Sequence, residues 1–137
     1  MAVLDTTILV DLMRKRQSPA ARRAAEVLRE LLADGDTLMT TRFNTAELYV
    51  GTEMSQDPTG EAARVDAALA PLRILDFDDA AARVYGRLEA SLRSAGRPVG
   101  DMDALIASVA LSNRQSVVTR NARHFQGIAG LVVHAVG

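Results

Sequence analysis

Short apolar runs alternate with longer amphipathic segments along the whole chain. The apolar runs span four or five residues and are rich in valine, leucine, isoleucine and threonine, a composition typical of buried strands. We therefore predict strands at residues 2–5, 37–41, 73–77, 116–119 and 131–135.

The segment at residues 18–35 gives the clearest helix prediction. Its apolar residues recur at steps of three and four, which places them on a single face. Ser18 is suited to the N-cap, Pro19 to the first helical position and Gly35 to the residue that ends the helix. This segment therefore carries its own start and stop signals.

The other segments between the predicted strands are also interpreted as helices. Thr6 or Thr7 is the expected cap of the first, and Asp78 or Asp79 the expected cap of the long helix that closes near Gly96. Further helices are predicted at residues 6–13, 44–54, 60–70, 78–95 and 101–111, with a short turn or helix at 121–125.

Strands that alternate with helices predict an α/β fold. The expected architecture is a twisted, mainly parallel sheet of four to five strands with helices on both faces. No linker, repeat or low-complexity tract interrupts residues 1–137, so we expect a single domain. Functional sites in such sheets form at the carboxyl ends of the strands.

Composition narrows the chemistry that is available. The 137 residues include no cysteine, which excludes disulfides and thiolate metal sites and suits a reducing compartment such as the cytoplasm. The formal net charge of −1 gives no overall attraction to nucleic acid. Asp5 and Asp11 interrupt the apolar N-terminus, so we expect neither a signal peptide nor a membrane span.

Asp101 and Asp103 begin a segment that is otherwise apolar. Capping explains Asp101, because aspartate is favoured at the N-terminus of a helix. Asp103 falls between Ile106 and Ala107 on the helical projection, in the middle of the predicted buried face. An unpaired buried charge costs more than a cap returns, so we expect a cationic partner for Asp103.

Asp5 and Glu47 each have two interpretations. Asp5 lies between two buried stretches and is either the cap of the following helix or a site residue. Glu47 follows Asn44 by three residues, the spacing of a capping box, and taken alone it favours that structural role.

Asn121 and His124 follow another predicted strand. Asn121 is suited to a plain turn, and a lone histidine at position 124 is more often packed or at the surface than a ligand. Taken together, however, Asp5, Glu47, Asp103 and Asn121 all lie where the sheet is expected to place its site.

Three carboxylates in one pocket need a counter-charge to remain ionised together. Oxygen ligands without thiolates favour Mg²⁺, with Mn²⁺ as a second choice. Such an ion activates water and holds phosphate oxygens, so the pattern favours phosphodiester hydrolysis.

Four stretches resemble the motifs of the PIN domain family, and in particular the VapC-type toxins of bacterial toxin–antitoxin pairs. They are LDTTILVDLM, TTRFNTAELYVG, GDMDALIASVAL and VVTRNARHFQGIAGL, and the resemblance spans roughly residues 2–134. By this resemblance Asp5, Glu47 and Asp103 match the family's acids, whereas Asn121 stands where aspartate is frequent. Thr7 replaces a frequent asparagine.

The resemblance implies a Mg²⁺-dependent endoribonuclease regulated by a cognate antitoxin, with many relatives forming homodimers. Asp5 and Asp103 would be the principal metal ligands, Glu47 a ligand or base, and Asn121 a supporting polar ligand. Supporting roles are also open to Thr7, Asp101, Thr119 and His124. The candidates for contact with the RNA backbone are Arg14, Lys15, Arg16, Arg120 and Arg123.

Two alternatives to the enzyme are considered. A receiver-like phosphoacceptor domain is poorly supported, because Lys15 is the only lysine in the sequence. A catalytically silent PIN-like binding module would keep the acids as helix caps, and Asn121 gives it some support.

Overall fold

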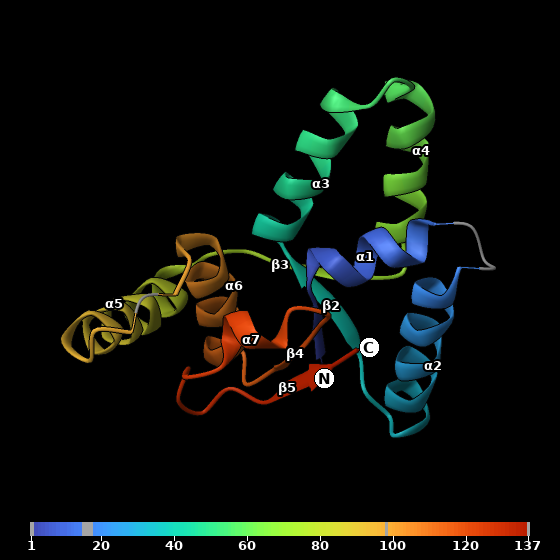
Figure 1. Ribbon diagram of the computed structural model, residues 1–137. Helices are drawn as coiled ribbons and strands as arrows, with labels where there is room; N and C mark the ends of the chain where they lie inside the picture. The colour runs from blue at the N-terminus through green and yellow to red at the C-terminus, as the bar shows by residue number, and fades with distance from the viewer. Residues whose placement is uncertain (1, 15–17, 98, 137) are drawn as a thin grey trace.

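The computed structural model describes residues 2–14, 18–97 and 99–136 (Figure 1). In this part of the chain five strands form one all-parallel sheet with the order β3-β2-β1-β4-β5. The α/β prediction is confirmed, although several strands are one or two residues shorter than expected. The strands are β1 (Ala2–Leu4), β2 (Leu38–Thr41), β3 (Arg73–Leu75), β4 (Ser116–Thr119) and β5 (Val133–Ala135).

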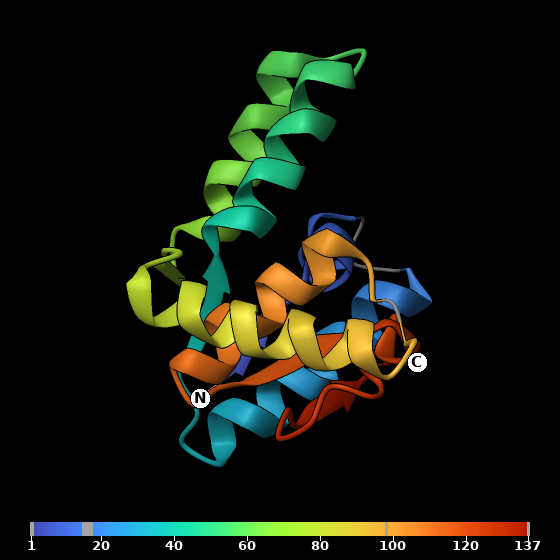
Figure 2. The same cartoon turned by 90° about the vertical axis from the view of Figure 1, so that its left-hand side faces the viewer.

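Helices cover both faces of the sheet, and α3 and α4 run together as a hairpin that projects beyond it (Figures 1 and 2). The described helices are α1 (Thr6–Met13), α2 (Pro19–Ala33), α3 (Arg42–Met54), α4 (Pro58–Leu69), α5 (Asp79–Ser94), α6 (Asp101–Ser112) and α7 (Ala122–Phe125). None of the helices in the described ranges is both long and apolar enough to cross a membrane.

The central strand β1 divides the hydrophobic core in two, because successive side chains of a strand point to opposite faces. Ala2 and Leu4 pack with apolar residues of α1, α2 and α4. Val3 packs on the other face with residues of α5, α6 and α7. All three side chains are fully buried, which accounts for the uninterrupted apolar run at this strand.

The start and stop signals of α2 act as predicted. The Ser18 hydroxyl accepts a hydrogen bond from the Ala21 amide at 3.1 Å, and Pro19 occupies the first helical position. Gly35 has φ +84°, a conformation that favours glycine, just beyond the end of the helix. Asp78 likewise caps α5 through the Ala81 amide at 2.9 Å.

Two predicted caps are wrong. The N-cap position of α1 is Asp5, which makes no side-chain cap bond, and Thr6 and Thr7 lie inside the helix. Helix α3 begins at Arg42 rather than Asn44, and its capping box joins Thr41 to Asn44. Glu47 therefore does not cap this helix. The Glu47 carboxylate instead accepts a hydrogen bond from Thr6 of α1.

The starts of two further helices also differ from the predictions. Helix α4 begins at Pro58, inside the stretch expected to be a loop, because Asp57 caps it through the Gly60 amide at 3.1 Å. In α6 the N-cap position is Gly100, so Asp101 is the first helical residue. Asp101 lies near the positive end of the helix dipole without capping it.

Candidate active site

Asp5 follows β1 directly, at the carboxyl end of the central strand, and its side chain is 5% exposed. The Thr119 hydroxyl donates to Oδ2 at 2.7 Å and the Thr7 hydroxyl donates to the same oxygen at 3.2 Å. The Asn44 amide donates to Oδ1 at 3.3 Å. Asp5 is therefore held by side chains from three elements, α1, α3 and β4.

The Glu47 side chain contacts the first residue of α1. The Thr6 hydroxyl donates to Glu47 Oε1 at 2.7 Å, and the Asn44 amide donates to the same Thr6 hydroxyl at 3.0 Å. Burial raises the pKa of Glu47, and the charges of Asp5 and Asp103 raise it further, against the lowering effect of the Thr6 hydrogen bond. Glu47 thus belongs to the same charged cluster as the other two acids.

Asp103 lies on the buried face of α6, as its spacing predicted, and its carboxylate meets a histidine. Asp103 Oδ2 lies 3.2 Å from His124 Nδ1, with the Asp103 side chain 25% exposed. Burial raises the pKa of Asp103, followed by the charge of Asp5, whereas His124 lowers it. The partner that meets Asp103 is therefore His124, whose side chain is 52% exposed, at the surface as the sequence favoured.

The other predicted site residues divide into two groups. Thr119 is fully buried and contacts Asp5 directly, as does the half-buried Thr7. Asn121 is exposed, and it joins the site through its backbone amide, which donates to the Thr119 hydroxyl at 2.9 Å. Asp101 is exposed and makes no hydrogen bond to the three acids within the described ranges.

Asn44 and Thr6 are the site residues that sequence reasoning missed. Asn44 is fully buried and bridges Thr6 and Asp5, while its side-chain oxygen accepts a hydrogen bond from the Thr41 hydroxyl at 2.7 Å. A signal existed in the spacing Thr41-x-x-Asn44, which matches the capping-box pattern with asparagine in place of glutamate.

Comparison with known proteins agrees with this geometry. The family model of the PIN domain matches residues 2–131. The chain belongs to the PIN domain family.

Similar proteins cover nearly the whole of this PIN domain. The tRNA(fMet)-specific endonuclease VapC of Shigella flexneri is 33% identical over 129 residues, which is 94% of this chain and 92% of that protein. Ribonuclease VapC19 of Mycobacterium tuberculosis is 34% identical over 125 residues, 91% of this chain and 92% of its own. The crystal structure of VapBC2 from Rickettsia felis, bound to a DNA fragment from its promoter, superposes with a TM-score of 0.85 at 29% identity. That match covers 98% of this chain and 97% of the other.

The three acids of the PIN domain influence one another electrostatically without forming a closed cage. Asp5 raises the pKa of both Glu47 and Asp103. Among the residues that the structure describes, no three histidine, aspartate or glutamate side chains lie close enough to share one ion. Hydrogen bonds orient the carboxylates, and any ion between them would need water to complete its shell.

Two cavities adjoin these acids. One of about 230 Å³ lies among α1, α3 and α4, with Thr6 and Glu47 at one side and the aliphatic side chains of Val10 and Leu48 along its wall. Another of about 340 Å³ brings Arg123 beside Asp103 and His124. Arg123 is therefore placed next to Asp103, and Arg14 lines the first cavity together with Glu47.

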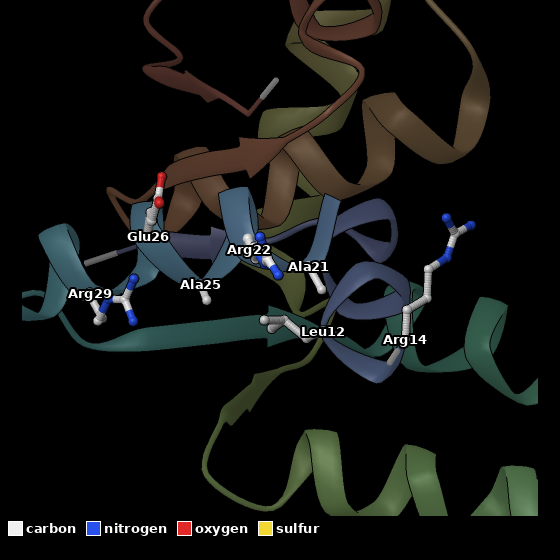
Figure 3. A pocket seen from close by; sticks show the side chains of 7 residues that line it. All are labelled: Leu12, Arg14, Ala21, Arg22, Ala25, Glu26 and Arg29. Atoms are coloured by element: carbon white, nitrogen blue, oxygen red, sulfur yellow. The ribbon is translucent and has the colours of Figure 1, made fainter. Parts of the chain in front are cut away.

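Arg14 and Arg120 also have neighbours outside these two cavities. Arg14 lines a cavity of about 490 Å³ beside α2 (Figure 3). There its guanidinium points away from those of Arg22 and Arg29, so the three cations do not converge on one point. Arg120 pairs with Asp11 at 2.8 Å. Lys15 and Arg16 lie outside the described residues.

Proposed function

We propose that this PIN domain is a Mg²⁺-dependent endoribonuclease and the toxin of a toxin–antitoxin pair. The observation that carries the proposal is the electrostatic coupling of Asp5, Glu47 and Asp103, three acids brought from separate elements to one end of the sheet. Relatives named VapC ribonucleases, similar over more than nine-tenths of their length, support the activity.

The donor set fits Mg²⁺, with Mn²⁺ as a substitute. Mg²⁺ is usually held by one or two carboxylates together with several waters, so a complete protein cage is not required. Asp5 and Asp103 would be the principal ligands and Glu47 a ligand through water. When bound, the ion supplies a water of lowered pKa and stabilises negative charge on a phosphate oxygen.

The chain's own residues orient the reacting groups. Thr119, Thr7 and Asn44 hold the two oxygens of Asp5, and Thr6 holds Oε1 of Glu47. Glu47 Oε2 accepts no hydrogen bond from the described residues, and burial raises the pKa of this carboxyl. Glu47 is therefore suited to accept a proton from a water that attacks the phosphodiester.

His124 and Arg123 complete the substrate side of the site. The His124 ring meets Asp103 and limits the orientations of that carboxylate. Arg123 lines the same cavity and is placed to contact an RNA phosphate beside the acids. Asn121 is assigned a supporting polar role from its neighbouring position on the chain.

The proposed protein partner is a cognate antitoxin. Solved structures that resemble this chain include VapBC2 of Rickettsia felis and VapBC-1 of nontypeable Haemophilus influenzae, the latter with a TM-score of 0.84 at 29% identity. Both chains are covered at 96% or more in these two matches, so the same kind of assembly is proposed for this protein.

A homodimer is also proposed, and its surface is not the apolar face of α2. The apolar face of α2 is used in the core, where Ala24 is fully buried and Leu28 is 8% exposed. Helix α3 instead exposes Tyr49, Val50 and Met54, of which Met54 is 81% exposed. Helix α3 is therefore the surface that we assign to the second copy.

The deciding experiment is cleavage of cellular RNA by the purified protein, mapped to single nucleotides, with Mg²⁺, with Mn²⁺ and with chelator. Asp5→Asn and Asp103→Asn are expected to reduce kcat by at least about a hundredfold, because each removes a charge assigned to the metal. Asp101→Asn is the matched control, since Asp101 lies on the same helix turn but is exposed.

Each possible result of that experiment has a definite meaning. Activity that requires metal and is lost in the two site variants supports the proposal. Cleavage that persists in chelator would contradict the metal, and intact RNA under all conditions would favour the catalytically silent binding module instead.

A further inference from the structure

Asp11 of α1 is a buried acid that the proposed reaction does not use. Its side chain is fully buried, and neither oxygen accepts a hydrogen bond from the described residues. Its cationic contact is Arg120, whose Nε lies 2.8 Å from Asp11 Oδ2. The pair joins a buried carboxylate to an arginine side chain that is 36% exposed. An ion pair of this kind without supporting hydrogen bonds is a weak source of stability, so we looked for another role.

Arg120 contacts two residues of α1. Its backbone amide donates to the Thr7 hydroxyl at 3.1 Å, and its guanidinium reaches Asp11. Thr7 and Asp11 are four residues apart in α1 and therefore lie on the same face, one turn above the other. Two contacts therefore hold the segment that follows β4 against one face of α1.

The last residue of β4 makes the shortest hydrogen bond to Asp5. Thr119 precedes Arg120, and its hydroxyl donates to Asp5 Oδ2 at 2.7 Å while it accepts from the Asn121 amide at 2.9 Å. The Thr7 hydroxyl accepts a hydrogen bond from the Arg120 amide and donates one to the same Asp5 oxygen at 3.2 Å. A shift of Arg120 away from α1 would therefore disturb two of the three donors that orient Asp5.

We propose that Asp11 and Arg120 are positioning residues whose ion pair holds residues 119–121 against α1 and so sets the orientation of the Asp5 carboxylate. The pair acts on metal binding through Asp5 and does not touch the RNA. This inference rests on the proposed function, and it replaces the expectation that Arg120 contacts the RNA backbone.

The test measures Mn²⁺ affinity by electron paramagnetic resonance, together with kcat and KM for an RNA oligonucleotide and the metal-free melting temperature. Arg120→Gln and Asp11→Asn are expected to weaken Mn²⁺ binding by about tenfold, the usual scale for a residue that orients a metal ligand. The kcat should fall by a similar factor with KM little changed. Arg120→Lys keeps the charge and is expected to recover part of the affinity.

A double variant distinguishes a positioning role of the Asp11–Arg120 pair from a role in the stability of the fold. Asp11→Leu with Arg120→Met removes both charges at once, so its melting temperature should match or exceed that of the wild type. Its Mn²⁺ affinity should stay low, because an apolar pair does not hold the segment at the same place. Arg83→Gln breaks an exposed ion pair with Asp79 on α5 and is the matched control, expected to change none of the three readouts.

The outcomes are distinct. Recovery of Mn²⁺ affinity together with melting temperature in the double variant would show that the pair serves stability alone and would overturn the inference. A higher KM for Arg120→Gln, with Mn²⁺ affinity unchanged, would assign Arg120 to the RNA instead. If the wild type itself neither binds Mn²⁺ nor cleaves RNA, the failure belongs to the proposed function and not to this pair.

Discussion

Asp101 and Asp103 are two residues apart, yet only one of them lies among the acids of the site. Helical periodicity separates them, because it places Asp103 on the buried face of α6 and Asp101 on the solvent side. The same periodicity led us to expect a cationic partner for Asp103 without naming it. The residue that meets Asp103 is His124, through contact between α6 and α7, which no local pattern reveals.

The sequence predicted some of the residues that donate hydrogen bonds to Asp5 and missed another. Thr7 and Thr119 were expected to support the site, and both donate to Asp5. Asn44 was assigned to a helix end, and its capping role with Thr41 was misplaced by one turn. Its second role, as donor to Asp5, depends on residues 39 positions apart and so was hidden from any short-range pattern.

The raised pKa of Glu47 predicts a pH-dependent stability of the metal-free protein. The folded state binds the Glu47 proton more tightly than the unfolded chain, so ionised Glu47 lowers the free energy of unfolding above its folded-state pKa. We expect Glu47→Gln to stabilise the metal-free protein near pH 7. The gain should vanish as the pH falls to about 4, the ordinary value of a glutamate.

Urea unfolding with chelator at a series of pH values measures this effect. The substitution keeps the acceptor oxygen that Thr6 uses, so the change is one of charge. Glu53→Gln is the matched control, because Glu53 is exposed on the same helix. A gain for Glu47→Gln that is constant across this pH range would contradict the electrostatic explanation.

At the scale of elements, prediction succeeded where the signal is local. The ends of α2 and α5 were correct because Ser18 and Asp78 cap their own helices through amides three residues ahead. It failed at the starts of α1 and α3, where the predicted cap residues lie inside the helix.

Glycines inside α3 and α5 give a prediction for these two helices. An added Cβ at Gly51 or at Gly86 meets no atom within 4 Å, so alanine fits at either position. Each Gly→Ala substitution should raise the free energy of unfolding by about 0.5–1 kcal/mol, because alanine loses less backbone entropy in a helix. Thermal or urea unfolding of the two single variants and the double variant measures it.

The two glycine variants also control for each other. Gly51 lines the cavity beside Glu47, whereas Gly86 lies on α5, away from that cavity. The gains should add in the double variant, since the positions share no contacts. A loss of stability at Gly51 alone would mean that α3 is bent or packed differently from the structure described here.

At the scale of the whole molecule, the parallel sheet brings Asp5, Glu47 and Thr119 together. Asp5 follows β1 at the centre of the sheet, Glu47 comes from the helix after β2, and Thr119 ends β4 on the other side of β1. Because the strands are parallel, their carboxyl ends lie at the same end of the sheet, and these residues lie there too. The order of elements was predictable from the alternating pattern, whereas the neighbours of each strand were not.

Exposed apolar side chains predict the surface of self-association. Met54→Glu on α3 is expected to shift the protein from dimer to monomer in sedimentation velocity at tens of micromolar, because it places a charge in the proposed interface. Its melting temperature as a monomer should change little, since Met54 is 81% exposed.

Leu32→Glu provides the comparison for that experiment. Leu32 is 54% exposed but lies on α2, so this variant should remain dimeric. Dissociation by Leu32→Glu and not by Met54→Glu would move the interface to α2. A wild type that is monomeric at every concentration would refute the homodimer.

The sequence by itself determined the order of strands and helices, the end of the sheet at which polar residues gather, and the separation of Asp103 from Asp101 on the helix. These properties follow from periodicity and from caps, which act over a few residues. Only the tertiary structure decided that His124 meets Asp103, that Asn44 and Thr119 hold Asp5, and that Arg120 turns to Asp11. Such contacts join residues as many as 114 positions apart, and their geometry exists only once the whole sheet has assembled.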